Sequence, residues 1–182
     1  GLDNPVSRDM AVQEAQTSAL RLMVKEGYLP ESIHALWSHF NADYFLHHTP
    51  YETRWHSELI LDLDECNLPL VAARPSEKGR AEIFIYAREH DDMFAGIAAT
   101  LNQLALNIVD AQIMTTDNGF TLDSFKVLEE DGRSPDSDMR IREIKQYLEK
   151  YLKTHILSSQ PERTASRAHR HFSTETSVRF EQ

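Results

Sequence analysis

The sequence is poor in the features that mark several common protein classes. It contains a single cysteine, Cys66, so no disulfide can form within the chain. A lone thiol fits a reducing compartment, and we therefore expect a cytoplasmic protein. No apolar run approaches the roughly 20 residues needed to cross a membrane. No segment resembles a signal peptide.

Basic residues are also scarce. The 182 residues include 19 Lys and Arg against 29 Asp and Glu, for a formal net charge of −10. This balance argues against nucleic acid or an anionic membrane as the main partner, because both require a basic surface. The length predicts one ordinary domain, or a small domain with an appendage.

Up to about Leu63 the pattern is helical. Apolar residues recur at helical spacing, first around Ala19 and then from Ile33 to Phe40. The segment "TPYE", Thr49 to Glu52, is typical of a capping box at the start of a further helix. We expect the buried stripe of that helix to comprise the following residues: Trp55, Leu59 and Leu63.

From about Ala81 strands and helices alternate. A strand in "RAEIFIYA" precedes a helical repeat, and "NIVDAQIMT" and "FTLDSFKVL" are two strands joined by the hairpin signal Asn118-Gly119. A second long helix follows, then a polar loop at Ser158–Arg167, and a last strand alternates from Phe172 to Phe180. The predicted order is β-α-β-β-α-β.

This order predicts an α+β chain with the ferredoxin-like arrangement, in which two helices cover one face of a four-stranded antiparallel sheet. We expect a helical segment at residues 1–66, a linker at 67–79 and the α/β domain at 80–182. The stretch from Leu68 to Gly79 reads as a linker or an exposed strand, because Pro69, Pro75 and Gly79 interrupt it.

The most conspicuous chemical candidates lie in "FIYAREHDDMFAGI". His90 next to Asp91 suggests a metal-dependent hydrolase, but nothing nearby supplies the further ligands that such a site needs. Asp91 or Asp92 is better explained as the cap of the following helix. The amides of the first turn also form a site for anions, so Glu89, His90 and those amides could hold a free amino acid.

Other polar residues give weaker signals. The nine histidines are scattered without cysteine partners or a helical pair four residues apart, so zinc is not indicated. Cys66 has acidic neighbours, which suppress its thiolate, so a catalytic thiol is not indicated either. No catalytic residue and no metal ligand is predicted.

Several segments together resemble a known family. "LNIVDAQI" followed by "NGFTLDSFKVLEEDG" resembles an ACT domain, and more narrowly the first ACT repeat of the PII uridylyltransferase/uridylyl-removing enzymes. The upstream "LWSHFNADYFLHHTPYETRWH" and the terminal "HRHFSTETSVRF" are similar to segments of the same family. The resemblance covers about Leu36 to Phe180.

The resemblance implies a regulatory role. Members of the family add and remove uridylyl groups on the PII signal protein in nitrogen regulation, and glutamine decides the direction. Their catalytic domains, of which the nucleotidyltransferase domain is expected to use magnesium, are absent from this chain. The chain itself would then be non-catalytic and without a cofactor, with residues 1–66 as the tail of the preceding HD domain and a connector.

The resemblance also implies a ligand site between paired ACT sheets, from a second repeat or a homodimer. Carried over, its residues are Glu89, His90, Asp91, Asp92, Met93, Phe94, Asn107, Ile108 and Asp110. Asp92 stands where many ligand-binding ACT loops have glycine, and its charge would oppose a ligand carboxylate.

Two alternatives stay open from the sequence. The chain could be a structural interaction or dimerisation domain that docks through its sheet edge without any small ligand. It could also be a small metal-dependent hydrolase that uses His90 and Asp91, and this is the weakest of the three hypotheses.

Overall fold

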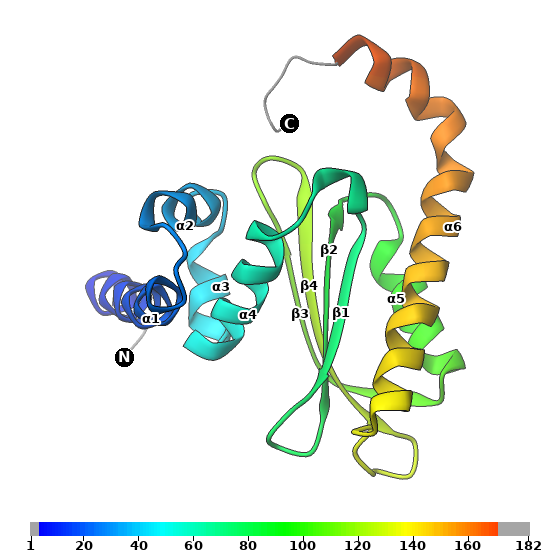
Figure 1. Cartoon of the computed structure of the whole chain (residues 1–182), viewed down its shortest axis with the longest axis horizontal. Coiled ribbons are helices and arrows are strands. Elements are labelled where there is room, and N and C mark those ends of the chain that lie inside the picture. Colours follow the sequence, from blue (N-terminus) through cyan, green and yellow to red (C-terminus); the bar gives the residue numbers. More distant parts are fainter. Residues whose placement is uncertain (1–3, 171–182) are drawn as a thin grey trace.

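The computed structural model describes residues 4–170, with side chains described for residues 4–64 and 66–156 (Figure 1). The elements are α1 (Pro5–Lys25), α2 (Pro30–Trp37), α3 (Ala42–His47), α4 (Pro50–Leu61), a short 3-10 helix (Glu65–Asn67), β1 (Leu70–Pro75), β2 (Ala81–Arg88), α5 (Met93–Gln103), β3 (Leu106–Thr115), β4 (Phe120–Glu129) and α6 (Asp138–Arg170).

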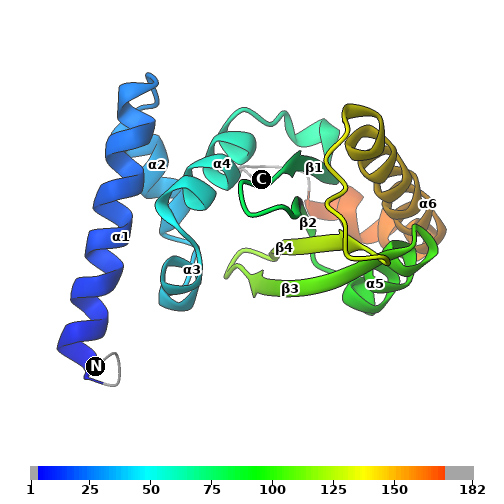
Figure 2. The same cartoon turned by 90° about the horizontal axis from the view of Figure 1, so that it is seen from below.

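The described elements form three layers, with one sheet between two layers of helices. The four strands are antiparallel to their neighbours in the order β1-β2-β4-β3. Helices α5 and α6 cover one face, and α1–α4 lie on the other side of the sheet (Figure 1, Figure 2). The predicted α+β class is confirmed, with a four-stranded antiparallel sheet, two helices on one face and a helical segment before it.

The fourth strand is supplied from an unexpected part of the chain. β1 pairs with β2 from Leu70↔Tyr86 to Pro75↔Ala81, so the stretch left open between a linker and a strand is an edge strand. Pro75 is tolerated there because it ends a strand at the sheet edge. The predicted last strand, Phe172–Phe180, lies outside the described residues.

The predicted polar loop at Ser158–Arg167 is wrong. These residues continue α6, which runs unbroken from Asp138 to Arg170. That prediction rests on polarity, and polarity alone does not separate a loop from a polar helix.

Alternation along the strands builds a separate apolar core on each face of the sheet. The core shared with α5 and α6 includes these residues: Ile83, Ile85, Ile97, Leu101, Phe125, Val127, Ile144, Leu148 and Leu152. The core shared with α1–α4 includes these residues: Ala19, Met23, Ile33, Trp37, Tyr44, Phe45, Phe84, Tyr86, Met114, Phe120 and Leu122. The N-terminal helices therefore pack against the sheet and do not form a separate segment beside it.

The start of α4 follows the prediction, but its buried face does not. Thr49 and Glu52 form the expected capping box. The predicted stripe of Trp55 and its apolar partners is only partly buried, and the buried residues are polar: Glu52, Thr53, His56 and Ser57. The helix therefore presents hydrogen-bonding groups to the sheet.

The Asn118-Gly119 hairpin between β3 and β4 is confirmed. Gly119 has φ +89°, a conformation that favours glycine. The hairpin touches both halves of the chain, because Gly119 O accepts a hydrogen bond from Glu89 N at 3.0 Å and Asp117 Oδ1 lies 2.6 Å from His39 Nδ1.

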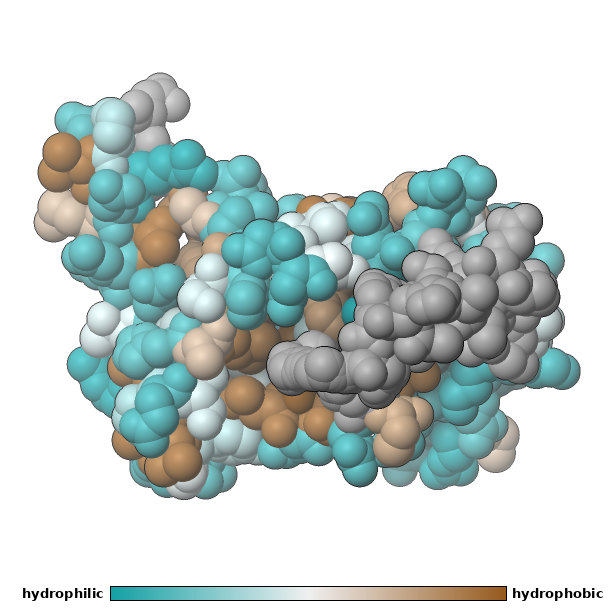
Figure 3. Space-filling view, turned by 90° about the horizontal axis from the view of Figure 1, so that it is seen from above, coloured by the Kyte–Doolittle hydropathy of each residue, from teal (hydrophilic) through white to brown (hydrophobic). Residues whose placement is uncertain are grey.

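Most of the surface is hydrophilic. Seen from above, hydrophobic residues gather in the middle of the view (Figure 3). In the part of the chain that the structure describes, no helix is both long and apolar enough to span a membrane.

Candidate functional site

The loop predicted to bind a ligand joins β2 to α5. Glu89, Asp91 and Asp92 are exposed, and His90 is half-buried. The backbone of Glu89 is fixed by its hydrogen bond to the β3–β4 hairpin. The loop is thus anchored at one end while its acidic side chains face solvent.

The expected capping role of Asp91 or Asp92 is wrong. Asp92 occupies the cap position of α5, but φ +61° and ψ +16° place it in the left-handed region, and no side chain caps α5 in the described structure. This conformation favours glycine, the residue that the resemblance expects here. The first-turn amides of α5 are consequently not satisfied by the side chain before them.

The ring of His90 lies beside α6. Its Nδ1 lies 3.3 Å from Asp91 O, and its ring centroid lies 4.7 Å from that of His155 on α6. Among the described residues, no group of three or more His, Cys, Asp or Glu side chains could hold a metal ion.

Met93 and Phe94 open α5 in different environments. Met93 is buried in the core between the sheet and α5. Phe94 is 47% exposed, and its ring stacks near Phe125 with centroids 6.1 Å apart. Phe94 thus offers an accessible aromatic surface beside the first-turn amides.

The remaining predicted residues lie at the other end of the sheet. Ile108 is level with Val127 and so with Ala81 at the start of β2, whereas the loop follows Arg88 at the end of β2. Seven strand residues separate these levels, or roughly 20 Å. Within one chain the structure does not bring Asn107, Ile108 and Asp110 to the loop, so their shared role in one ligand site stays a prediction.

A β-bulge separates Ile108 from Asp110. Ile108 pairs with Val127 and Asp110 pairs with Lys126, so two residues of β3 advance against one of β4. Ile108 faces the core under α5 and α6. The extra residue at the bulge turns Asp110 to the opposite face, towards α3 and α4.

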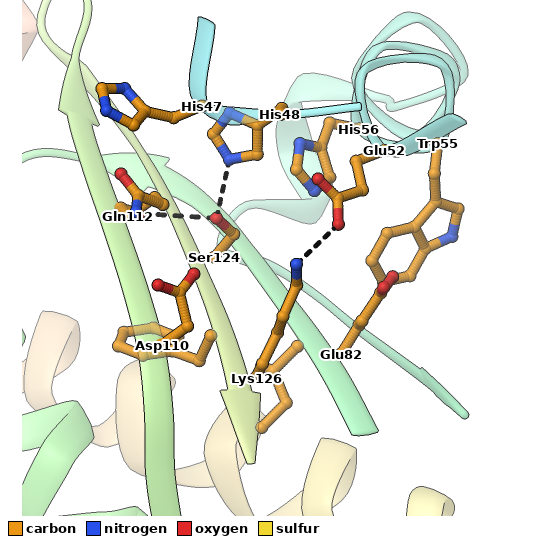
Figure 4. Close-up of a pocket in the computed structure, with 12 residues that line it drawn as sticks. His47, His48, Glu52, Trp55, His56, Glu82, Asp110, Gln112, Ser124 and Lys126 are labelled. Carbon is orange, nitrogen blue, oxygen red and sulfur yellow. Dashed lines mark hydrogen bonds and ion pairs between the residues drawn. The ribbon is translucent and has the colours of Figure 1, made fainter. Parts of the chain in front are cut away.

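There Asp110 lines a polar cleft between the helical segment and the sheet (Figure 4). Helices α3 and α4 provide one wall, and β2, β3 and β4 provide the other. The lining residues are His47, His48, Glu52, Trp55, His56, Glu82, Ile83, Asp110, Gln112, Ser124, Phe125 and Lys126. The cavity volume is about 20 Å³, which admits a group of the size of a water molecule.

Polar contacts cross this cleft. Lys126 Nζ lies 2.8 Å from Glu52 Oε2, and His48 Nε2 lies 3.0 Å from Ser124 Oγ (Figure 4). Deeper in, His56 Nδ1 lies 2.7 Å from Tyr44 Oη. The His56 ring stacks on Phe84 with centroids 4.0 Å apart. These contacts hold α3 and α4 against the sheet.

Burial keeps the two inner histidines neutral. It lowers the pKa of His48, and it lowers the pKa of His56 well below its usual value, with further lowering by His48, Arg74 and Lys126. Burial alone would raise the pKa of Glu52, but the ion pair with Lys126 lowers it overall. The cleft thus contains an ionised Glu52–Lys126 pair beside neutral imidazoles.

A second buried carboxyl lies on the other face of β4. Asp123 is 2% exposed and accepts a hydrogen bond from the Thr121 hydroxyl. Burial, with a smaller contribution from the nearby charge of Glu89, raises its pKa to about 6, although the hydrogen bond from Thr121 lowers it. Its location therefore links the middle of the sheet electrostatically to the predicted ligand loop.

The sequence reasoning missed most of the cleft. The sequence predicts a capping role for Glu52 and strand positions for Lys126 and Ser124, but no shared site. A signal was present in the polar face of α4 and in the alternation of polar residues along "LDSFK". The bulge that delivers Asp110 has no sequence signal of its own.

Comparison with known proteins supports the resemblance. Residues 7–59 match the family model described as the uridylyltransferase GlnD fifth domain. The chain is 39% identical over 170 residues to the bifunctional uridylyltransferase/uridylyl-removing enzyme of Idiomarina loihiensis, covering 93% of this chain and 19% of that protein. The enzyme of the same name from Pseudomonas savastanoi pv. phaseolicola is 40% identical over 158 residues, covering 84% of this chain and 18% of that protein.

The chain therefore spans about a fifth of the length of these curated relatives. No solved structure matches it. Similarity over most of this chain, together with the matched fifth domain, leads to one assignment: the chain belongs to the family of bifunctional uridylyltransferase/uridylyl-removing enzymes.

Proposed function

We propose that this chain is a regulatory, non-catalytic segment that senses a free amino acid, with glutamine as the effector. In this proposal it acts in the cytoplasm as part of an enzyme that adds and removes uridylyl groups on the PII signal protein. Family membership supports the parent activity, because the matched relatives are named uridylyltransferase/uridylyl-removing enzymes. The fold supports a binding module, since it places a loop, a helix start and an exposed sheet edge at the surface.

The observation that carries the sensing role is the uncapped start of α5. Among the described side chains none caps its first turn, and Asp92 adopts a left-handed conformation directly before it. Free first-turn amides and the positive end of the helix dipole favour a carboxylate. Glu89 and His90 lie on the adjacent loop and would receive the ammonium group. Asn107 and Ile108 would contribute across an interface with a second ACT sheet, whereas the bulge turns Asp110 away to the opposite face.

Calorimetric titration of the chain with glutamine tests this proposal. Ala95→Asp places a carboxylate in the first turn of α5, where it competes with the ligand carboxylate for the amides and also suits the helix dipole. The matched control is Ala99→Asp, one turn further along the same helix. Both alanines are exposed, so neither change disturbs the core.

Glutamine should bind the Ala95→Asp variant at least about tenfold more weakly than it binds the parent chain. This is the effect expected from the loss of one charge-assisted hydrogen bond. Ala99→Asp should bind as the parent does. Equal glutamine affinity of the parent chain, Ala95→Asp and Ala99→Asp would show that the site is not at the start of α5. If neither this chain nor a longer chain with a second ACT repeat binds glutamine, the sensing role is wrong.

The second candidate function is docking through the sheet edge. β3 is an edge strand, and its Val109 and Ile113 side chains are 42% and 47% exposed. Such an edge invites pairing with another strand. Sedimentation at several concentrations should show dimers that Ile113→Lys abolishes, while Met139→Lys on α6 leaves them intact. A monomer at every concentration counts against this role.

A further inference from the structure

The cleft under α3 and α4 contains one carboxylate whose charge is not matched. Three acidic side chains line it, Glu52, Glu82 and Asp110. Glu52 is paired with Lys126 at 2.8 Å, and Glu82 Oε1 accepts from Arg74 Nε at 2.8 Å. The Asp110 carboxylate makes no hydrogen bond or ion pair with the residues that the structure describes, although its backbone pairs with Lys126 of β4.

The nearby positive charge does not neutralise Asp110. Lys126 is close enough for Asp110 to contribute to the raised pKa of its ammonium, but the Lys126 ammonium is bound to Glu52 across the cleft. The neighbouring imidazole of His48 carries no charge near neutral pH, because burial lowers its pKa. Asp110 therefore introduces a half-buried negative charge that folding alone does not require.

The bulge in β3 places the Asp110 carboxylate in the cleft. Without the extra residue, period-two alternation would put residue 110 on the same face as Ile108, inside the apolar core. With it, Asp110 points to the cleft beside Gln112 and Ser124 (Figure 4). Bulges commonly re-aim a side chain next to a functional site.

We propose that this cleft is a second ligand site, in which Asp110 receives the primary ammonium group of a small molecule. A cavity of about 20 Å³ matches such a group. Gln112 from β3 and His47 from α3 line the same cleft and surround the rest of the ligand. An ammonium ion fits better than a metal, because no group of three or more metal-binding side chains converges in the described structure.

The location gives the ligand a regulatory role. One wall of the cleft belongs to the segment matched by the fifth-domain model, and the other wall belongs to the sheet. A ligand that contacts both walls binds only when α3 and α4 are seated on the sheet, so its binding stabilises that arrangement. This inference does not depend on the site at the start of α5.

Nuclear magnetic resonance titration tests the inference on the whole chain. The first probe is ethylammonium chloride, compared with sodium chloride at equal ionic strength. The second pair is glutamine and glutaramic acid, which is glutamine without its ammonium group. The variants are Asp110→Asn, its backup Asp110→Ser, and the control Asp131→Asn, an exposed acid in the loop before α6.

Ethylammonium should shift the amide signals of Asp110, Gln112 and Ser124 in the parent and in Asp131→Asn, and at least about tenfold more weakly in the Asp110 variants. If glutamine shifts the same signals and glutaramic acid does not, a free amino acid is the source of the ammonium group. If only ethylammonium shifts these signals, a simple amine is the source of the ammonium group. Glutamine shifts confined to residues 93–95 support the sensing proposal alone.

The inference is overturned if ethylammonium leaves the cleft signals unchanged in the parent chain. It is also overturned if the Asp110 variants respond as the parent does. Either result can coexist with glutamine binding at α5, so the two proposals fail separately.

Discussion

Lys126 Nζ lies 2.8 Å from Oε2 of Glu52, and this ion pair joins the central strand β4 to the first turn of α4. The other carboxylate oxygen of Glu52 accepts the Thr49 amide at 3.0 Å. One side chain thus starts a helix and fastens it to the sheet. The helical segment and the α/β domain are coupled through this contact as well as through their apolar core.

The first prediction concerns this pair. Lys126→Met leaves the buried Glu52 carboxylate without its partner and should lower the free energy of unfolding by about 1–3 kcal/mol. Glu52→Gln keeps the capping box, which accepts Gln as well as Glu. Adding Glu52→Gln to Lys126→Met should therefore recover most of the loss. Urea unfolding of the single and double variants measures this, and strictly additive losses would contradict it.

The second prediction concerns pH and the buried histidines. Burial lowers the pKa values of His48 and His56, so the folded chain holds them neutral while the unfolded chain binds protons below pH of about 6.5. The free energy of unfolding should therefore decrease as pH falls below about 6.5, by up to about 1.4 kcal/mol per pH unit for each histidine. The groups that face them are Tyr44, Glu52 and Lys126, with His47 and Arg74 nearby.

Unfolding curves between pH 8 and pH 5 check this expectation. A variant with both His48→Gln and His56→Gln should show a shallower decrease, even though it loses packing at every pH. An unchanged slope in that variant would mean that other groups cause the acid sensitivity.

The third prediction concerns Asp123, whose contribution to stability changes with pH in the opposite direction to that of the histidines. Asp123 has its pKa raised to about 6 by burial, with Thr121 lowering it and Glu89 raising it. The folded chain keeps this proton where the unfolded chain has lost it, so the contribution of Asp123 decreases stability as pH rises from about 4 to about 6. Asp123→Asn should be more stable at pH 7 by about 1–3 kcal/mol.

The difference in unfolding free energy between Asp123→Asn and the parent isolates this contribution from that of the histidines. It should increase from pH 4 to pH 6 and then level off. A difference that does not vary with pH would show that Asp123 titrates normally in the folded chain.

The fourth prediction concerns the contact between α5 and α6. A Cβ added at Gly96 would lie 1.7 Å from the Tyr151 hydroxyl oxygen and 2.6 Å from Tyr151 Cζ. Gly96→Ala must displace that ring and should destabilise the chain by about 1–3 kcal/mol despite the better helix propensity of alanine. Adding Tyr151→Leu should recover part of the loss. Thermal unfolding tests this, and a more stable Gly96→Ala variant would contradict it.

Local signals predicted a large part of this fold. The strand at Ala81–Arg88, the Asn118-Gly119 hairpin and the capping box at Thr49 each depend on residues close in sequence, and all three were found. Leu70–Pro75 could not be assigned, because two prolines obscure a strand that is fixed only by pairing with β2. Its place in the sheet is a tertiary effect.

The candidate sites were less accessible to sequence reasoning. The residue types around His90 gave the position of the loop, but not the left-handed backbone of Asp92, which depends on how the chain turns into α5. The resemblance places Asp110 in one ligand site with the loop at Glu89–Phe94. Only the bulge, which no residue pattern announces, shows that it faces Lys126 and not the loop.

Hydrogen exchange with and without glutamine tests the proposed glutamine sensing most directly. Binding at the start of α5 should slow exchange of the Met93 and Phe94 amides, which none of the described side chains caps. The Ala95→Asp variant should lose that protection. Exchange that glutamine leaves unchanged along the whole chain, alone and joined to a second repeat, would contradict the account.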